Sequence, residues 1–181
     1  MKTSDGVTAL YPGSFDPVHN GHLDIIVRAR RVFGRVVVAV ATNVGKQAMF
    51  PTKDRVEMLR AAMAGQEGIE VQAFEGLTVE FAASIGAGVI VRGLRANEDF
   101  EFELKMAAMN KRLHSEIETV FMMTSPEYAY LSSTLIREVT GFGGSVAGLI
   151  PAAVEARLAR RRRRIPRASP ASAGLPKPRR K

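Results

Sequence analysis

The stretch NGHLDIIVRARRVFGRVVVAVAT, residues 20–42, changes its hydrophobic period at a single glycine. Residues 20–33 carry Leu23, Ile26 and Val27 with arginines on the opposite side, the pattern of an amphipathic helix. Residues 35–42 form a continuous, mostly β-branched apolar run, which is typical of a strand covered on both faces. A helix that leads directly into such a strand indicates a parallel sheet with helices packed on its faces.

The same alternation continues on both sides of this stretch. Short apolar runs predict further strands at 6–11, 69–74, 88–93 and 117–123, and helical periodicity predicts further helices at 51–65, 78–87, 97–113, 132–139 and 151–164. We therefore predict an α/β fold, a single domain with a doubly wound, five-stranded parallel sheet. In such sheets, ligands bind beyond the carboxyl ends of the strands, near the point where the strand order reverses.

Hydroxyl side chains mark the predicted starts of three helices. Thr52 and Thr78 are predicted N-caps, and Ser132 and Ser133 are predicted tandem caps. Pro151 suits the first turn of the last helix, where a missing backbone N–H costs nothing.

The positive charge of the chain is concentrated near its C-terminus. The formal net charge is +8, but residues 157–181 hold 11 Lys or Arg and no acidic residue, which leaves 15 Lys or Arg against 18 Asp or Glu before them. The body of the chain is therefore mildly acidic, and nucleic acid is expected to be contacted weakly, through the tail, at most. We predict one folded domain at 1–164 and a disordered tail rich in Pro, Ala and basic residues at 165–181.

The composition also excludes several classes of protein and site. The chain has no cysteine, so it has no disulfide, thiol nucleophile or thiolate metal site. No apolar run approaches the roughly 20 residues that a membrane helix needs, and the N-terminus lacks the apolar core of a secretory signal. We expect a cytoplasmic protein without membrane contact.

Polar and basic side chains follow four of the predicted strands. They comprise Ser14, Asp16, His19 and His22 after the first strand, Asn43 and Lys46 after the second, Arg92 and Arg95 after the fourth, and the segment 124–134 after the fifth. Hydroxyls, cations and helix N-terminal amides donate to phosphate oxygens, so this edge of the sheet is predicted to bind a polyanion. No Walker-type glycine loop, acidic pair or Ser/His/Asp set is present, and no metal site is predicted.

Four spaced motifs resemble those of one enzyme family. GSFDPVHNGH at 13–22 resembles the signature of the HxGH nucleotidyltransferases. Three further motifs point to one family within this group, namely VRGLR at 91–95, DFEFELKMAAMNKRL at 99–113 and YLSSTLIREV at 130–139. Their order and spacing are similar to those of the bacterial phosphopantetheine adenylyltransferases, over about residues 8–158. That family joins ATP to 4′-phosphopantetheine, giving dephospho-coenzyme A and pyrophosphate.

The resemblance implies a Rossmann-like fold, Mg²⁺ with ATP, a homohexamer and a set of site residues. His22, Lys46 and Arg95 would be catalytic. Ser14, Lys46, Thr78 and Arg92 would bind 4′-phosphopantetheine. ATP would be bound by Ser14, Phe15, His22, Gly93, Leu94, Arg95, Glu103, Tyr128, Ala129, Tyr130, Leu131, Ser132, Ser133 and Thr134.

The chemistry of this reaction agrees with the residues present. The nucleophile would be the substrate's own phosphate, which is largely ionised at pH 7 because its second pKa is about 6. No general base is then needed, and His22 at a helix start would donate to the α-phosphate in the transition state. Gly21 would let ATP approach the backbone, and His19 would begin the helix beside the phosphates.

Structural explanations exist for several of these residues. His22 and Thr78 could serve only as caps, Ser14 as a turn serine, Lys46 as a solvated cation, and Glu103 as part of an exposed helix face. Arg137 could support the cap serines, and the methionines at 106, 109, 122 and 123 would fill the core or meet at a subunit interface.

Two other functions stay open at this point. A nucleotidyltransferase acting on nicotinate mononucleotide would share the 13–22 motif but would not be expected to have the 91–95 and 99–113 motifs. A nucleic-acid-binding module would depend on the basic tail and would leave the motif residues without a purpose.

Overall fold

The computed structural model describes residues 6–42, 48–95 and 97–164, and the predicted tail at 165–181 lies outside them. Its elements, in chain order, are β1 Thr8–Gly13, α1 Asn20–Phe33, β2 Arg35–Ala41, α2 Thr52–Ala62, β3 Ile69–Phe74, α3 Thr78–Ser84, β4 Val89–Leu94, α4 Asn97–Leu113, β5 Glu118–Met123, the 3₁₀ turn η1 Pro126–Tyr128, α5 Ser133–Gly141 and α6 Ala152–Arg164. The predicted α/β class is confirmed.

The five strands form one parallel sheet in the order β3-β2-β1-β4-β5. From β1 the chain winds outward through β2 to β3, and then returns to place β4 on the other side of β1. The strand order therefore reverses between β1 and β4, which makes this boundary the expected ligand site of a doubly wound sheet.

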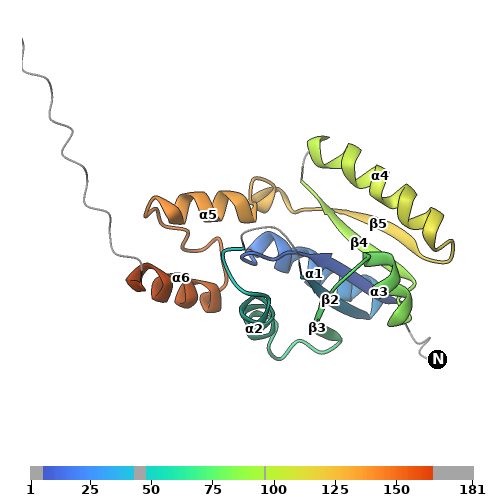
Figure 1. Cartoon of the computed structure of the whole chain (residues 1–181), viewed down its shortest axis with the longest axis horizontal. Helices are drawn as coiled ribbons and strands as arrows, with labels where there is room; N and C mark the ends of the chain where they lie inside the picture. Colours follow the sequence, from blue (N-terminus) through green and yellow to red (C-terminus); the bar gives the residue numbers. More distant parts are fainter. Residues whose placement is uncertain (1–5, 43–47, 96, 165–181) are drawn as a thin grey trace, which may run out of the picture.

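Helices cover both faces of the sheet. On one face, Ala9, Val38 and Val91 pack with α1, α2 and α6, and on the other, Leu10 and Ile90 pack with α3. In Figure 1, α5 and α6 lie together toward one end of the long axis, and α3 and α4 lie toward the other. Among the described residues, no helix has the length and apolarity that crossing a membrane would require.

Two predicted N-caps are wrong. Pro51 is the N-cap of α2 and Leu77 is the N-cap of α3, so Thr52 and Thr78 are instead the first helical residues. The hydroxyl of Thr52 accepts a hydrogen bond from Arg55 rather than capping the backbone. The prediction for α5 is correct in part, because Ser132 alone is the cap and accepts from the Leu135 N–H at 3.0 Å.

The interpretation of the methionines as core filler is also wrong for most of them. Met106, Met109 and Met123 are 40%, 55% and 60% exposed, and only Met122 packs against the core. Met106 and Met109 are exposed because α4 lies over the β4–β5 edge of the sheet, and no other element of the described residues covers its outer side.

Candidate active site

A cavity of about 400 Å³ opens where β1 and β4 separate. β1 pairs with β2 over its whole length, but with β4 only at Ala9↔Val89 and Leu10↔Ile90. Beyond these pairs the guanidinium of Arg92 donates to the Pro12 carbonyl oxygen at 3.0 Å, so a side chain bridges the gap that the backbones leave. The crevice thus lies at the strand-order reversal, as predicted.

The turn after β1 forms the floor of this cavity. Phe15 is 1% exposed and has a φ of 47°, a region that non-glycine residues rarely occupy. Its ring packs edge-on against Tyr11, with centroids 5.6 Å apart, and against His22, with centroids 5.0 Å apart. A Cβ at Gly13 would lie 2.9 Å from the Phe15 ring, so this position requires glycine. The turn is therefore held in a strained shape by buried aromatic packing.

The two histidines stack at the start of α1. His19 is the N-cap, and its ring centroid lies 3.7 Å from that of His22. The backbone N–H of His19 donates to Nδ1 of His22 at 3.2 Å, which assigns the remaining proton of a neutral His22 to Nε2. A Cβ at Gly21 would lie 3.2 Å from the His19 ring and 3.3 Å from Tyr128, which is tighter than ordinary van der Waals contact. Gly21 also lines the cavity, and the close approach of ATP to its backbone stays a prediction.

Burial keeps both imidazoles neutral at pH 7. Desolvation, and then the nearby charge of Arg95, lowers the pKa of His19 to about 4. Desolvation, followed by His19 and Arg95, holds the pKa of His22 well below its usual value. A neutral His22 with its proton on Nε2 can donate a hydrogen bond to an anion, and it is a poor general acid or base at this pH.

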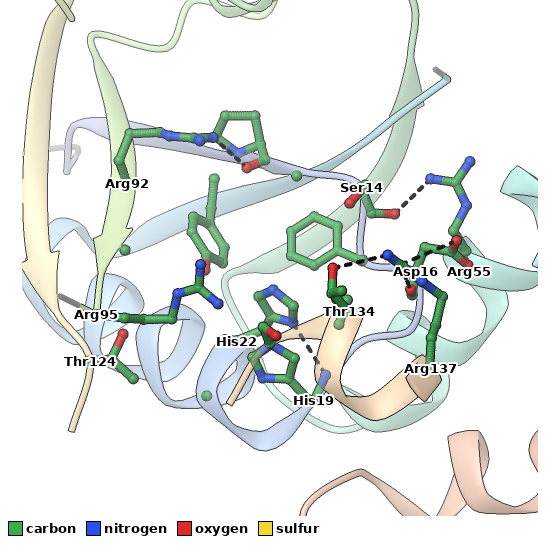
Figure 2. A pocket seen from close by; sticks show the side chains of 18 of the residues that line it. Ser14, Asp16, His19, His22, Arg55, Arg92, Arg95, Thr124, Thr134 and Arg137 are labelled. Atoms are coloured by element: carbon green, nitrogen blue, oxygen red, sulfur yellow. Dashed lines mark hydrogen bonds and ion pairs between the residues drawn. The ribbon is translucent and has the colours of Figure 1, made fainter. Parts of the chain in front are cut away.

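Arginines surround the histidines on two sides. Figure 2 shows Arg92 and Arg95 on one side of the cavity and Arg55 and Arg137 on the other, with the two rings between them. Arg95 also donates to the Leu131 carbonyl at 3.1 Å, which ties it to the segment before α5. Such a ring of guanidinium groups and hydroxyls suits a ligand with several phosphates.

Glu103 has a different environment from the exposed helix face that we considered. It is 8% exposed, and its two carboxylate oxygens accept from Nε and Nη2 of Arg92 at 2.7 and 2.5 Å. This bidentate pair borders the main cavity and also a second cavity of about 140 Å³. The second cavity is lined by Pro12, Thr78, Ile90, Arg92, Phe102, Glu103, Met106, Ala107, Asn110 and Thr119.

The start of α5 closes the main cavity. Ser132, Ser133 and Thr134 all line it, and the Ser133 hydroxyl donates to the Pro17 carbonyl at 2.9 Å. Arg137, one turn into the helix, donates to the Asp16 carbonyl at 2.6 Å. The helix start and the turn after β1 are therefore fastened to each other, and the α5 N-terminus adds a favourable dipole for anions.

Most of the predicted site residues come together in this one cavity. It is lined by Ser14, Phe15, His19, Gly21, His22, Arg92, Gly93, Arg95, Glu103, Ser132, Ser133, Thr134 and Arg137, all of which the sequence analysis named. Five predicted ATP contacts do not line it, namely Leu94, Tyr128, Ala129, Tyr130 and Leu131, and Thr78 lies in the second cavity. Lys46 lies outside the described residues.

Four residues that line the cavity were not predicted from the sequence, namely Tyr11, Pro12, Ala48 and the one charged residue among them, Arg55. It is only 3% exposed, although arginine is rarely buried to this extent. A signal existed, since Arg55 shares the phase of Met58 and Leu59 and so belongs to the buried face of α2.

Comparison with known proteins now places the chain. Residues 10–139 match the cytidylyltransferase-like family model. A phosphopantetheine adenylyltransferase of Heliobacterium modesticaldum is 52% identical over 83% of this chain and 90% of its own length. The chain belongs to the phosphopantetheine adenylyltransferase family. Two further relatives have the same name. The protein of Moorella thermoacetica is 50% identical over 84% of this chain and 96% of its own length. The protein of Synechococcus elongatus is 51% identical over 84% of this chain and 92% of its own length.

In this phosphopantetheine adenylyltransferase family member, the two carboxylates among the cavity residues, Asp16 and Glu103, are engaged within the protein. The two oxygens of Asp16 accept from the Met49 and Phe50 N–H groups at 2.7 and 2.9 Å, and those of Glu103 accept from Arg92. Over the part of the chain that the structure describes, no three His, Asp or Glu side chains group as metal ligands.

Proposed function

We propose that this chain transfers the adenylyl group of ATP to 4′-phosphopantetheine, giving dephospho-coenzyme A and pyrophosphate. The observation that carries the proposal is the convergence of Ser14, His22, Arg92, Arg95 and the α5 N-terminus on one crevice at the strand-order reversal. The names of the relatives supply the identity of the two substrates.

The reaction is an in-line displacement at phosphorus. An oxygen of the substrate phosphate forms a bond to the α-phosphorus of ATP, and the bond from that phosphorus to the bridging oxygen of the β-phosphate breaks. Pyrophosphate leaves with the electron pair. Because a phosphate monoester is largely ionised at pH 7, no protein group has to remove a proton from the nucleophile. This fits a site whose histidines are neutral and whose carboxylates are already engaged.

The residues then divide into two groups around the reacting phosphorus. His22 Nε2–H and Arg95 would donate to the oxygens of the ATP phosphates as charge develops on them. The free amides at the start of α5 would take the β- and γ-phosphates, aided by the helix dipole. Arg92, and by resemblance Lys46, would hold the phosphate of the acceptor against the α-phosphorus.

The second cavity suits the rest of the acceptor. Its lining combines apolar side chains, such as Ile90, Phe102 and Met106, with Thr78, Asn110 and Thr119, which can hydrogen-bond amides. Arg92 borders both cavities, so a phosphate at its guanidinium could have its pantetheine arm in the second cavity while ATP occupies the first.

Mg²⁺ fits this site as a partner of the nucleotide. Since Asp16 and Glu103 are both engaged, the ion would be held mainly by phosphate oxygens and water, as is usual for Mg²⁺ with ATP. When bound, it would neutralise charge on the phosphates. His22, Arg95 and the α5 amides would still orient the α-phosphate.

The exposed apolar face of α4 supports the proposed homo-oligomer. Phe102, Met106, Met109 and Leu113, which share one face of the helix by their spacing, are between 40% and 63% exposed. A contiguous apolar surface of this kind usually marks an interface. We propose the hexamer that the resemblance implies. Sedimentation should show a multimer for the natural chain and a smaller species for Met109→Glu, and identical sedimentation would contradict this role of α4.

The activity is tested by offering ATP with either of two acceptors. We expect pyrophosphate to form with 4′-phosphopantetheine and not with nicotinate mononucleotide, and the reverse result would move the chain to the other nucleotidyltransferase class. Deleting residues 165–181 is expected to leave turnover unchanged, because none of the proposed site residues lies in that segment. The cytoplasmic location expected from the sequence stays a prediction.

A further inference from the structure

Arg55 is a nearly buried cation in the wall of the main cavity. Its side chain lies on α2, it is 3% exposed, and all three of its nitrogen atoms donate hydrogen bonds. Within the described part of the chain, it forms no ion pair within 4.0 Å. Burial lowers the pKa of Arg55, and the charge of Asp16 opposes that shift. Burying a charge in this way costs free energy, which indicates that the hydrogen bonds of Arg55 have a structural or functional role.

The guanidinium joins three separate segments through their carbonyl oxygens. Nη1 donates to Ser14 in the turn after β1 at 2.6 Å and to Ala41 at the end of β2 at 3.0 Å. Nε donates to Phe50, just before α2, at 3.1 Å, and Nη2 donates to the Thr52 hydroxyl at 2.9 Å. Four bonds in fixed directions require the planar fork of arginine, which the single point charge of lysine cannot reproduce.

The turn after β1 gains its shape from this contact. Arg55 holds the Ser14 carbonyl, and the next residue, Phe15, is the one with a φ of 47°. Strained backbone of this kind persists only where the surroundings over-determine it. Arg137 and Ser133 hold the next carbonyls, those of Asp16 and Pro17. The carbonyl oxygens at 14, 16 and 17 are thus bound by donors from α2 and α5, as Figure 2 shows for Ser14 with Arg55.

The effect of Arg55 reaches the reacting centre through Phe15. The Phe15 ring packs against the His22 ring, so a shift of the turn would move the imidazole. A donor displaced by even about 1 Å can lose a large part of its effect on a transition state. Arg55 itself is held by four protein acceptors, and it acts through Ser14 and Phe15 rather than on the phosphates.

We propose that Arg55 is a positioning residue for adenylyl transfer, which clamps the Ser14–Phe15 turn so that His22 meets the α-phosphate of ATP. The inference rests on the proposed function and adds a residue that the motifs do not contain.

The experiment compares Arg55→Lys and Arg55→Met with Arg60→Lys as a matched control. Arg60 lies on the same helix and donates to the Val71 carbonyl at 2.9 Å, but it lines neither cavity. We expect Arg55→Lys to lower kcat by about 10- to 100-fold with the KM for ATP within about threefold, since an interaction needed mainly in the transition state is lost. Arg60→Lys should keep kcat within about twofold of the natural chain.

A second step separates positioning from a general loss of structure. In a His22→Asn background, Arg55→Lys should cost at most about threefold in kcat, because residues that act as one unit are not additive. All variants are assayed at a temperature where circular dichroism shows them folded. Should the Arg55 variants not fold, Thr52→Val removes one acceptor of the fork, and we expect it to lower kcat by about two- to fivefold without changing the KM for ATP.

The outcomes are distinct. Unchanged kcat in Arg55→Lys, an equal loss in Arg60→Lys, or full additivity with His22→Asn would each overturn the inference. If the Arg55 variants do not fold, unchanged kcat in Thr52→Val overturns it. Absence of pyrophosphate from the natural chain with 4′-phosphopantetheine would instead overturn the proposed function.

Discussion

The buried histidine pair predicts that the protein loses stability in mild acid. His19 is 4% exposed and its pKa is lowered to about 4, whereas an unfolded chain would have a value near 6.5. Between these two pH values the unfolded state binds more protons than the folded state, so stability falls as the pH falls. At pH 5, one and a half units below 6.5, His19 alone costs about 2 kcal/mol, at about 1.36 kcal/mol per unit. His22 shifts in the same direction and adds to the loss.

The measurement is urea unfolding at pH 7 and pH 5, at one fixed protein concentration, for the natural chain and His19→Asn. The free energy of unfolding should fall by about 2 kcal/mol more in the natural chain than in the variant. His114→Asn is the control, because this histidine lies at the surface against Glu80, away from the pair. If His19→Asn loses as much stability as the natural chain over this interval, the imidazole is not held neutral by burial and the reasoning is wrong.

Three further predictions concern single side chains of the site. His22→Ala should lower turnover by roughly 10²–10³, as for the loss of one transition-state donor, and near-normal turnover would refute its role. Glu103→Gln should raise the KM for 4′-phosphopantetheine about tenfold with little change in that for ATP, because the bidentate partner of Arg92 is lost; a change confined to the KM for ATP would favour direct nucleotide contact. Ser132→Ala should cost about 1 kcal/mol of stability in a thermal melt, since α5 loses its N-cap, and an unchanged melting temperature would contradict this.

The sequence predicts the long elements well because their periodicity is unambiguous. The bounds of α1, α4 and β3 agree with the predicted ranges 20–33, 97–113 and 69–74. β1 is displaced by two residues, since Pro12 and Gly13 were assigned to a turn and the strand continues through them. Pro12 is tolerated there because β4 has already separated from β1, so no ladder partner lies on that side.

The site residues divide by the kind of signal they leave in the sequence. Side chains after strand ends, such as Ser14, His22 and Arg95, were predictable because parallel strands bring their carboxyl ends to one edge. The pairing of Arg92 with Glu103 was not predictable, because no sequence pattern indicates which cation a given carboxylate contacts in the folded protein. The exposure of Met109 was not predictable either, because an apolar helix face suits a core and an interface equally well.

The brief pairing of β1 with β4 determines how the site is assembled. Ser14 and His22 come from the half of the sheet that is complete at β3, whereas Arg92, Arg95 and Ser133 come from the half that begins at β4. β1 and β4, which join these halves, pair at only two positions, Ala9 with Val89 and Leu10 with Ile90. Ala9 and Val89 line neither cavity, yet this short pairing fixes how the two halves lie beside each other and so how far apart the site residues on them are. Ala9 is fully buried, and its side chain packs into the core on the α1 face of the sheet. A bulkier residue there would displace α1 and the His22 that it carries, and would weaken catalysis without touching a ligand.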